Sequence, residues 1–330
     1  MPLWTRTLVL AMLVLSQCSS AHAWSDAGHK IIAAIAWRQL RPEQRHEVLR
    51  LLSHHPRYEE DFLRQQPESL TDEEDRHEWL FQQAAVWPDI TRGLPELEKT
   101  RFHRSTWHYI NKPLFLTPTD ERHGAAALQL NQAVIPPRAA EETMNIVQAI
   151  RFARRELAHH EHPVAERALW LTWLFHTVGD VHQPLHSTTM INVPRLPDGD
   201  RGGNAIPTKQ RGNLHALWDG FPGGRVQLAE SRQRALTWLH DPELLAATKN
   251  AARELNEEVW LRESQQLSET VVYDDEVRTF LKQLPAEKLT EPGPRLELTE
   301  EYLERGGHLS RRRILQAGLR LGAVLDRLFP

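Results

Sequence analysis

Cysteine is almost absent from this chain, and so are other features that stabilise or modify many exported proteins. The one cysteine among 330 residues is Cys18, so a chain that loses its first residues has no thiol and no disulfide. No Asn-x-Ser or Asn-x-Thr glycosylation acceptor occurs. Beyond the first residues, no apolar stretch is long enough to span a membrane. Stability is therefore expected to come from side-chain packing, with bound metal as a second source.

Positive charge is not in excess either. The 40 lysine and arginine residues face 44 aspartate and glutamate residues, which gives a formal net charge of -4. This balance does not imply a basic surface for duplex DNA. The arginines near the C-terminus are predicted to form a solvated helix face; they are Arg311, Arg312, Arg313, Arg320 and Arg327.

Residues 1–23 have the pattern of a cleaved signal peptide. Arg6 precedes the apolar run Leu8 to Leu15, and a small-x-small cleavage pattern ends at Ala23. Cleavage there would start the mature chain at Trp24. We therefore expect a bacterial protein that is periplasmic or secreted.

A mature chain that begins at Trp24 would offer a free amine to a metal ion. The amine and the first carbonyl group can chelate one ion together, and His29 lies close enough along the chain to join them. The alternative is an ordinary secreted N-terminus, in which Trp24 and His29 occur by chance.

Apolar periodicity predicts a mostly helical, all-α protein without convincing alternating strands. Residues 24–330 are expected to form a single compact domain, although length alone would suggest two. Thr71 with Glu74 predicts a capping box at the start of one helix. The predicted helices cover residues 29–39, 42–52, 71–86, 142–157, 164–181, 225–239, 242–261, 274–284 and 309–328.

Two long loops, 112–138 and 191–212, interrupt these helices. Both contain proline and glycine, and the second contains Gly202-Gly203-Asn204. Because loops of this length rarely serve only as connectors, we expect 191–212 to form one wall of a binding cleft, with Asn204 near the site.

Histidine and aspartate recur at helical spacing in two apolar segments. His176 and Asp180 are four residues apart, so on a helix they share one face. Pro184 is expected to end that helix and to let His186 turn back toward the same site. His182 falls on another face and is left out of the ligand set.

A second pair, His215 and Asp219, repeats the same spacing. Isolated pairs of this kind are more often surface partners than ligands. Here they lie in apolar segments, where unpaired polar groups are costly to bury. Imidazole and carboxylate without thiolate suit zinc.

These residues resemble the S1/P1 nucleases, the zinc-dependent, single-strand-preferring class I nucleases of fungi, plants and bacteria. The resemblance extends from Trp24 to about Asp219, followed by a compatible helical tail. It is carried by Trp24 with His29, Trp87-Pro88-Asp89, Trp107-His108-Tyr109-Ile110-Asn111, the segment from His176 to His186, Gly202-Gly203-Asn204, Asn213-Leu214-His215 and Trp218-Asp219.

The resemblance implies the phospholipase C and class I nuclease fold and three zinc ions. The first ion would be held by Asp89, His108, His176 and Asp180. The second would be held by His186, His215 and Asp219. The third would be held by Trp24, His29 and Asp180. Asp180 would therefore bridge two ions, in a strongly phosphate-seeking pocket.

The implied reaction is hydrolysis of single-stranded DNA and RNA to 5′-phosphorylated products, with 3′-nucleotidase activity as a further option. Asp89, Arg92 and Asp180 are expected to be catalytic, and Arg92 would contact the phosphate unless it is a surface salt-bridge residue. Tyr109 would stack on a base, with core packing as the alternative. Asn111 departs from the fungal pattern, which has Asp there, so base preference is not transferred.

Two other functions remain open from the sequence. A zinc-dependent phospholipase C shares the fold, the Trp start and the metal layout. A non-enzymatic periplasmic zinc-binding protein would have filled coordination. We expect a monomer without a stable protein partner. The other histidines are predicted to face solvent; they are His54, His55, His103, His159, His160 and His162.

Overall fold

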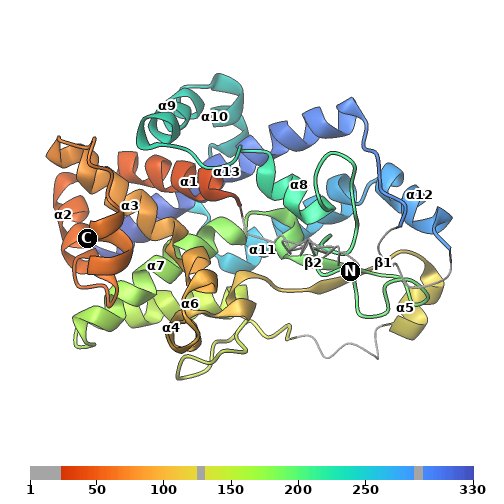
Figure 1. Ribbon diagram of the computed structural model, residues 1–330, viewed down its shortest axis with the longest axis horizontal. Helices are drawn as coiled ribbons and strands as arrows, with labels where there is room; N and C mark the ends of the chain where they lie inside the picture. The colour runs from red at the N-terminus through yellow and green to blue at the C-terminus, as the bar shows by residue number, and fades with distance from the viewer. Residues whose placement is uncertain (1–23, 125–130, 286–292) are drawn as a thin grey trace, which may run out of the picture.

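The computed structural model describes residues 24–124, 131–285 and 293–330, whose helices pack around buried apolar cores (Figure 1). The leader predicted for residues 1–23 lies outside the described residues. The helices are α1 (Asp26–Gln39), α2 (Pro42–Leu52), α3 (Glu73–Ile90), α4 (Glu96–Phe102), α5 (Pro118–Gly124), α6 (Ile146–Ala158), α7 (Val164–Asp180), α8 (Leu214–Gly220), α9 (Leu228–Leu239), α10 (Pro242–Thr248), α11 (Glu257–Leu267), α12 (Asp275–Gln283) and α13 (Glu300–Leu328). The strands are β1 (Lys112–Phe115) and β2 (Thr188–Ile191). The all-α prediction is confirmed, because these strands are short and helices make up most of the fold.

None of the helices in the described ranges combines the length and the apolar character that a membrane crossing requires.

The larger core surrounds α1, which is buried on nearly all sides. Its residues from Ala27 to Trp37 are all buried, as expected of a helix that is apolar around its whole circumference. It packs against α3, α9 and α13, and α13 runs through much of the molecule to end near α2 (Figure 1). At that end the Gln44 amide donates a hydrogen bond to the carbonyl of Phe329 at 2.8 Å.

A second core lies around β2, α8 and α12, with Met190, Trp218 and Val277 buried inside it. β1 and β2 pair in parallel, with Lys112 opposite Thr188 and Phe115 opposite Ile191. The sequence contains no convincing alternating strand, and it predicted neither β1 nor β2. All four residues of β2 are buried, so the strand has no apolar and polar alternation by which it could be recognised.

Several predicted helices agree closely with the structure, but one predicted helix is divided in two. α2 begins and ends where it was predicted, whereas 242–261 contains a break between α10 and α11. Asn256 caps the start of α11 by accepting a hydrogen bond from the Glu258 amide at 2.9 Å.

The cap of α3 is Asp72 rather than Thr71, so the predicted capping box was wrong. Part of the predicted loop 112–138 forms β1 and α5.

Candidate metal centre

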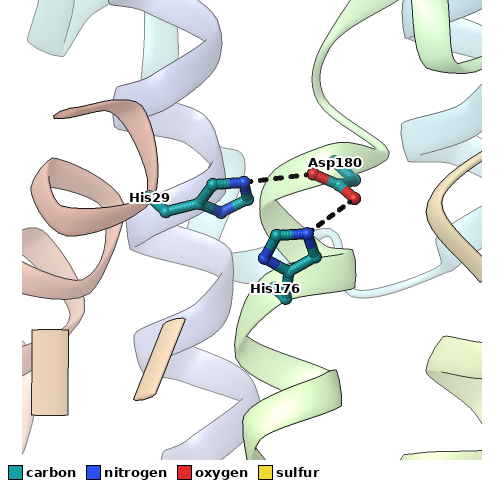
Figure 2. A group of neighbouring side chains, drawn as sticks. All are labelled: His29, His176 and Asp180. Atoms are coloured by element: carbon teal, nitrogen blue, oxygen red, sulfur yellow. Dashed lines mark ion pairs between the residues drawn. The ribbon is translucent and has the colours of Figure 1, made fainter. Parts of the chain in front are cut away.

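Three side chains from α1 and α7 converge where these helices meet (Figure 2). His29 Nε2 lies 3.2 Å from Asp180 Oδ1, and His176 Nε2 lies 3.2 Å from Asp180 Oδ2. The rings of His29 and His176 stack with centroids 4.0 Å apart. The shared helical face expected of His176 and Asp180 is therefore present, and α1 adds a second imidazole to it.

Asp89 and His108 approach the same imidazole from α3 and from a 3₁₀ turn over Ser105–His108. His108 Nδ1 is 3.0 Å from both His176 Nε2 and Asp180 Oδ2. Asp89 Oδ1 is 3.7 Å from His176 Nε2. These residues form a second potential metal group, which shares His176 with the first.

The third group contains His186, His215 and Asp219, all buried. His215 and Asp219 lie one turn apart on α8, with Nε2 and Oδ2 separated by 3.4 Å. α7 ends at Asp180, and a short turn over Pro184–His186 brings His186 back toward the site. The structure thus brings together the eight histidine and aspartate side chains that the sequence indicated.

The short parallel strands explain why His108 and His186 are neighbours. Just before the strands, the Ile110 amide donates to the carbonyl of His186 at 2.8 Å. His186 Nδ1 donates to the carbonyl of His108 at 2.6 Å. The strand pair therefore fixes two candidate ligands that are far apart in the sequence.

Backbone carbonyl groups orient two more imidazoles. His176 Nδ1 donates to the carbonyl of Ala85 at 2.8 Å, and His215 Nδ1 donates to the carbonyl of Gly202 at 2.6 Å. Each bond fixes the proton on Nδ1 and leaves the Nε2 lone pair available, which is the usual arrangement around a metal ion.

The carbonyl of Gly202 can reach His215 because the backbone turns sharply there. Gly202 and Gly203 have φ values of +62° and +82°, which residues with a Cβ rarely adopt. A Cβ on Gly202 would also lie 2.3 Å from the carbonyl oxygen of Leu185. The Gly-Gly pair is thus required by the wall of the site.

The donor set fits a bound metal. Seven buried atoms of the candidate ligands make no hydrogen bond with any described residue; they are His29 Nδ1, His29 Nε2, Asp89 Oδ1, His108 Nε2, Asp180 Oδ1, His186 Nε2 and Asp219 Oδ2. Unsatisfied buried polar atoms are destabilising, and a cation among them would satisfy several at once. Imidazole and carboxylate together favour zinc over calcium or magnesium.

Burial favours the neutral imidazole, which is the form that binds metal. It lowers the pKa of His108 and of His215 to about 3, and positive neighbours add to the effect in both cases. Burial also lowers the pKa of His29 and His186. His176 differs: burial lowers its pKa, but the adjacent Asp180 and Asp89 raise it more.

The carboxylates depend on neighbouring positive charge. Burial opposes ionisation of Asp89, but His176 and Arg92 bring its pKa down to about 2. Burial also opposes ionisation of Asp180, yet His176 and His186 hold its pKa well below the ordinary value. Burial raises the pKa of Asp219 well above the ordinary value, because the hydrogen bond that it accepts from the Gln183 amide at 2.7 Å is too weak to offset burial, and the charge of Asp180 adds to the rise. A bound cation would keep Asp219 ionised.

A cleft of about 540 Å³ opens beside these groups. All four residues proposed to touch a substrate line it: Arg92, Tyr109, Asn111 and Asn204. Arg92 also lies 3.0 Å from Asp89 Oδ1. The loop 191–212 forms part of the cleft wall, as expected, through Arg201 and Asn204.

The sequence reasoning missed other residues of this cleft, namely His103, Ser105, Arg201 and Asn213. Asn213 could have been found from the sequence, because asparagine directly before a helical segment is a typical N-cap. In the structure it caps α8 by accepting a hydrogen bond from the Ala216 amide at 2.7 Å. His103 was predicted to face solvent, but it is half-buried and lies 3.2 Å from the Thr91 hydroxyl.

Trp24 lies between two ligand-bearing helices. Its indole is fully buried and donates to the carbonyl of Gly179 at 3.1 Å. The amide of Ser25 donates to the carbonyl of Asp219 at 3.1 Å. The start of the described chain is thus held next to Asp180 and Asp219.

Some predictions about residues outside the ligand set were wrong. His55 is buried, with its ring 4.2 Å from that of Trp87, because the distant α3 covers it. Arg313 and Arg320 are buried as well and do not belong to a solvated face. They pair with Glu263, and Arg320 donates to His182 Nε2 at 2.8 Å. His182 is outside the potential metal groups, as predicted.

Comparison with known proteins agrees with this geometry. The S1/P1 Nuclease family model matches residues 24–330. Endonuclease 2 of Arabidopsis thaliana is 25% identical over 335 residues, covering 98% of this chain and 96% of the relative. Endonuclease 1 of the same plant is 23% identical, with 98% and 92% covered. Because the family match spans nearly the whole chain and includes the converging histidines and aspartates, the protein belongs to the S1/P1 nuclease family and is a hydrolytic enzyme, a nuclease.

Proposed function

We propose that the protein is a zinc-dependent phosphodiesterase that cuts single-stranded DNA and RNA to 5′-phosphorylated products. The observation that carries the proposal is the convergence of three His and Asp groups, with unsatisfied ligand atoms, beside a cleft lined by Tyr109. The resemblance to zinc-dependent nucleases favours three ions.

Three ions would divide these ligands among them, as the resemblance implies. Asp89, His108, His176 and Asp180 would hold the first, and His186, His215 and Asp219 the second. His29 and Asp180 would hold the third together with the backbone of Trp24. When bound, the ions would lower the pKa of a water molecule and neutralise charge on the phosphate.

The side chains around the cleft would position the strand. Arg92 lines the cleft while lying next to Asp89, so it can donate to a nonbridging phosphate oxygen. Half-buried Tyr109 presents a ring on which an unpaired base can stack, and a duplex does not expose that face. Asn111 and Asn204 offer amide groups to the base or sugar.

We also propose that export and cleavage before Trp24 complete the third metal group in the periplasm or outside the cell. The proposal is supported by the buried indole of Trp24 and by its bond to the residue before Asp180. The intact mass of the exported protein, measured with its metal content under native conditions, tests the cleavage position and the number of ions together.

Asp180→Asn tests the proposed chemistry, because Asp180 would bridge two of the three proposed ions. We expect the variant to lose metal and to cut single strands at least roughly a hundredfold more slowly, since the ions and their neighbours act as a unit. Asp198→Asn changes an exposed acid in the loop 191–212 and should leave both properties unchanged. Normal metal content and full activity in Asp180→Asn would refute the assignment. Phosphatidylcholine hydrolysis without nuclease activity would instead indicate a phospholipase C.

A further inference from the structure

A second pocket of about 430 Å³ lies beside the metal centre, and neither the sequence motifs nor the proposed function accounts for it. Asp89 and Arg92 form part of its lining, together with Asp26, Gly93 and Arg225. Arg92 lines the base-binding cleft as well, so the two pockets adjoin at this residue. His108 faces the cleft and Asp89 faces the second pocket, yet both belong to one potential metal group.

Arg225 is carried by a short loop, residues 223–226, which is fixed against the start of α1. The Val226 amide donates to Asp26 Oδ1 at 3.0 Å, and the Ala27 amide donates to the carbonyl of Gly224 at 3.0 Å. The Lys30 ammonium group donates to the carbonyl of Val226 at 3.0 Å. Bonds on both sides of Arg225 therefore hold its backbone at the rim of the pocket.

The charges of the pocket leave Arg225 without a counter-ion. Asp26 pairs with Lys30 at 2.9 Å, and Asp89 lies 3.0 Å from Arg92. Arg225 is exposed, and its guanidinium group makes no hydrogen bond or ion pair with any residue of the described ranges. A fixed backbone with an unmatched cation suits an anion that arrives from solution.

We propose that Arg225 binds a neighbouring phosphate of the same strand whose scissile phosphate lies at the metal centre. The inference rests on the proposed function, and it adds the path that the strand takes away from the metal centre. A strand with a base beside Tyr109 continues past Arg92 into the second pocket, where its next phosphate meets Arg225. A substrate that ends at the metal centre does not reach this arginine. Arg225 therefore favours longer strands over dinucleotides.

The test is Arg225→Gln, with Arg225→Lys as the charge-conserving variant and Arg262→Gln as a matched control. Arg262 is an exposed arginine on α11 that lines neither pocket. The probe is a labelled ten-residue oligothymidylate in which methylene groups replace the bridging 3′ oxygens, so that the zinc-loaded protein binds it without cutting it. Fluorescence anisotropy at several salt concentrations gives the affinity.

Loss of one phosphate contact should weaken binding of this probe roughly tenfold in Arg225→Gln. The slope of log affinity against log salt should become shallower by about 0.7, the single-strand value for one phosphate. Arg225→Lys should recover part of the loss, and Arg262→Gln should match the wild type. With cleavable substrates, the KM for the decamer should rise while that for a dinucleotide stays the same.

An unchanged affinity and salt slope in Arg225→Gln would overturn the proposal, as would equal losses for decamer and dinucleotide. The failure of the proposed function is distinguishable, because binding is measured without cleavage. If the wild type binds the probe but cuts no single strand, the proposed function fails while Arg225 is still tested. If the wild type binds no oligonucleotide at all, both proposals fall.

Discussion

The pKa values of individual buried carboxyl groups in this protein are shifted in opposite directions: that of Asp89 is lowered, and that of Asp200 is raised. Asp200 belongs to the loop 191–212, directly before the cleft residue Arg201, and is fully buried. It accepts hydrogen bonds from the Tyr273 hydroxyl at 2.6 Å and from the Met190 amide at 2.8 Å. Burial nevertheless raises the pKa of Asp200 to about 6. The folded protein therefore holds this proton more tightly than the unfolded chain does.

This residue predicts a pH dependence of stability. Its contribution is fully present below the unfolded pKa of 3.8 and is lost as pH rises through the folded pKa of about 6. The wild type should lose about 3 kcal/mol of stability in total relative to Asp200→Asn, which cannot ionise, and most of the loss should fall between about pH 4 and about pH 7. Urea unfolding of both proteins at matched pH values measures this difference. A difference that does not vary with pH would contradict the assignment.

At the level of elements, α13 stabilises the end of α7 through buried arginines. Arg313 donates to the carbonyl of His182 at 3.1 Å and to the Ser264 hydroxyl at 2.7 Å. Burial lowers the pKa of Arg313 to about 10, so it stays protonated at neutral pH. Glu263 of α11 supplies its counter-charge at 2.7 Å. These bonds connect α13 and α11 to the segment that directly follows Asp180 at the end of α7.

Arg313→Ala should therefore destabilise the fold by about 3 kcal/mol, because a buried carbonyl and a hydroxyl lose their partner. Its neighbour Arg312 is exposed on the same helix, and Arg312→Ala should change stability by less than about 0.5 kcal/mol. The free energy of unfolding from denaturant titration compares the two variants. Equal effects would restore the idea of a solvated arginine face.

The elements also show what the sequence could predict and why the rest escaped it. Spacing of four residues was enough to place His176 with Asp180, because both sit on one regular helix. Burial of His55 depends on Trp87, which comes from another helix, and no local pattern reports such a contact. The break after α10 is likewise invisible to periodicity, since apolar residues continue across it. The misassigned residues are therefore those whose burial or secondary structure depends on long-range packing.

For the whole molecule, the candidate metal groups lie where the two largest hydrophobic cores meet. His29, Asp89 and His176 come from helices of the larger core, whereas His215 and Asp219 come from α8 in the smaller one. Bound ions would therefore hold the cores together in addition to serving chemistry. The residue types at this junction were predictable, but their assignment to two cores was not, because the sequence suggested one continuous helical body.

Metal removal should thus lower stability as well as activity. A ligand at a thousand times its Kd stabilises a protein by about 4 kcal/mol, which for a chain of this size is a fall in Tm of roughly 6 °C after chelation. Scanning calorimetry before and after chelation measures the shift, and zinc should restore both Tm and cleavage where magnesium does not. Cleavage of denatured DNA that survives complete chelation would contradict the metal dependence.

The buried position of Trp24 has a practical consequence for producing the protein. Trp24 is fully buried, with its indole bonded to Gly179, whereas Pro330 is exposed. An affinity tag or fluorescent fusion therefore belongs at the carboxyl terminus. Under the proposed cleavage before Trp24, a recombinant version with an N-terminal tag needs a protease site that leaves tryptophan as the first residue.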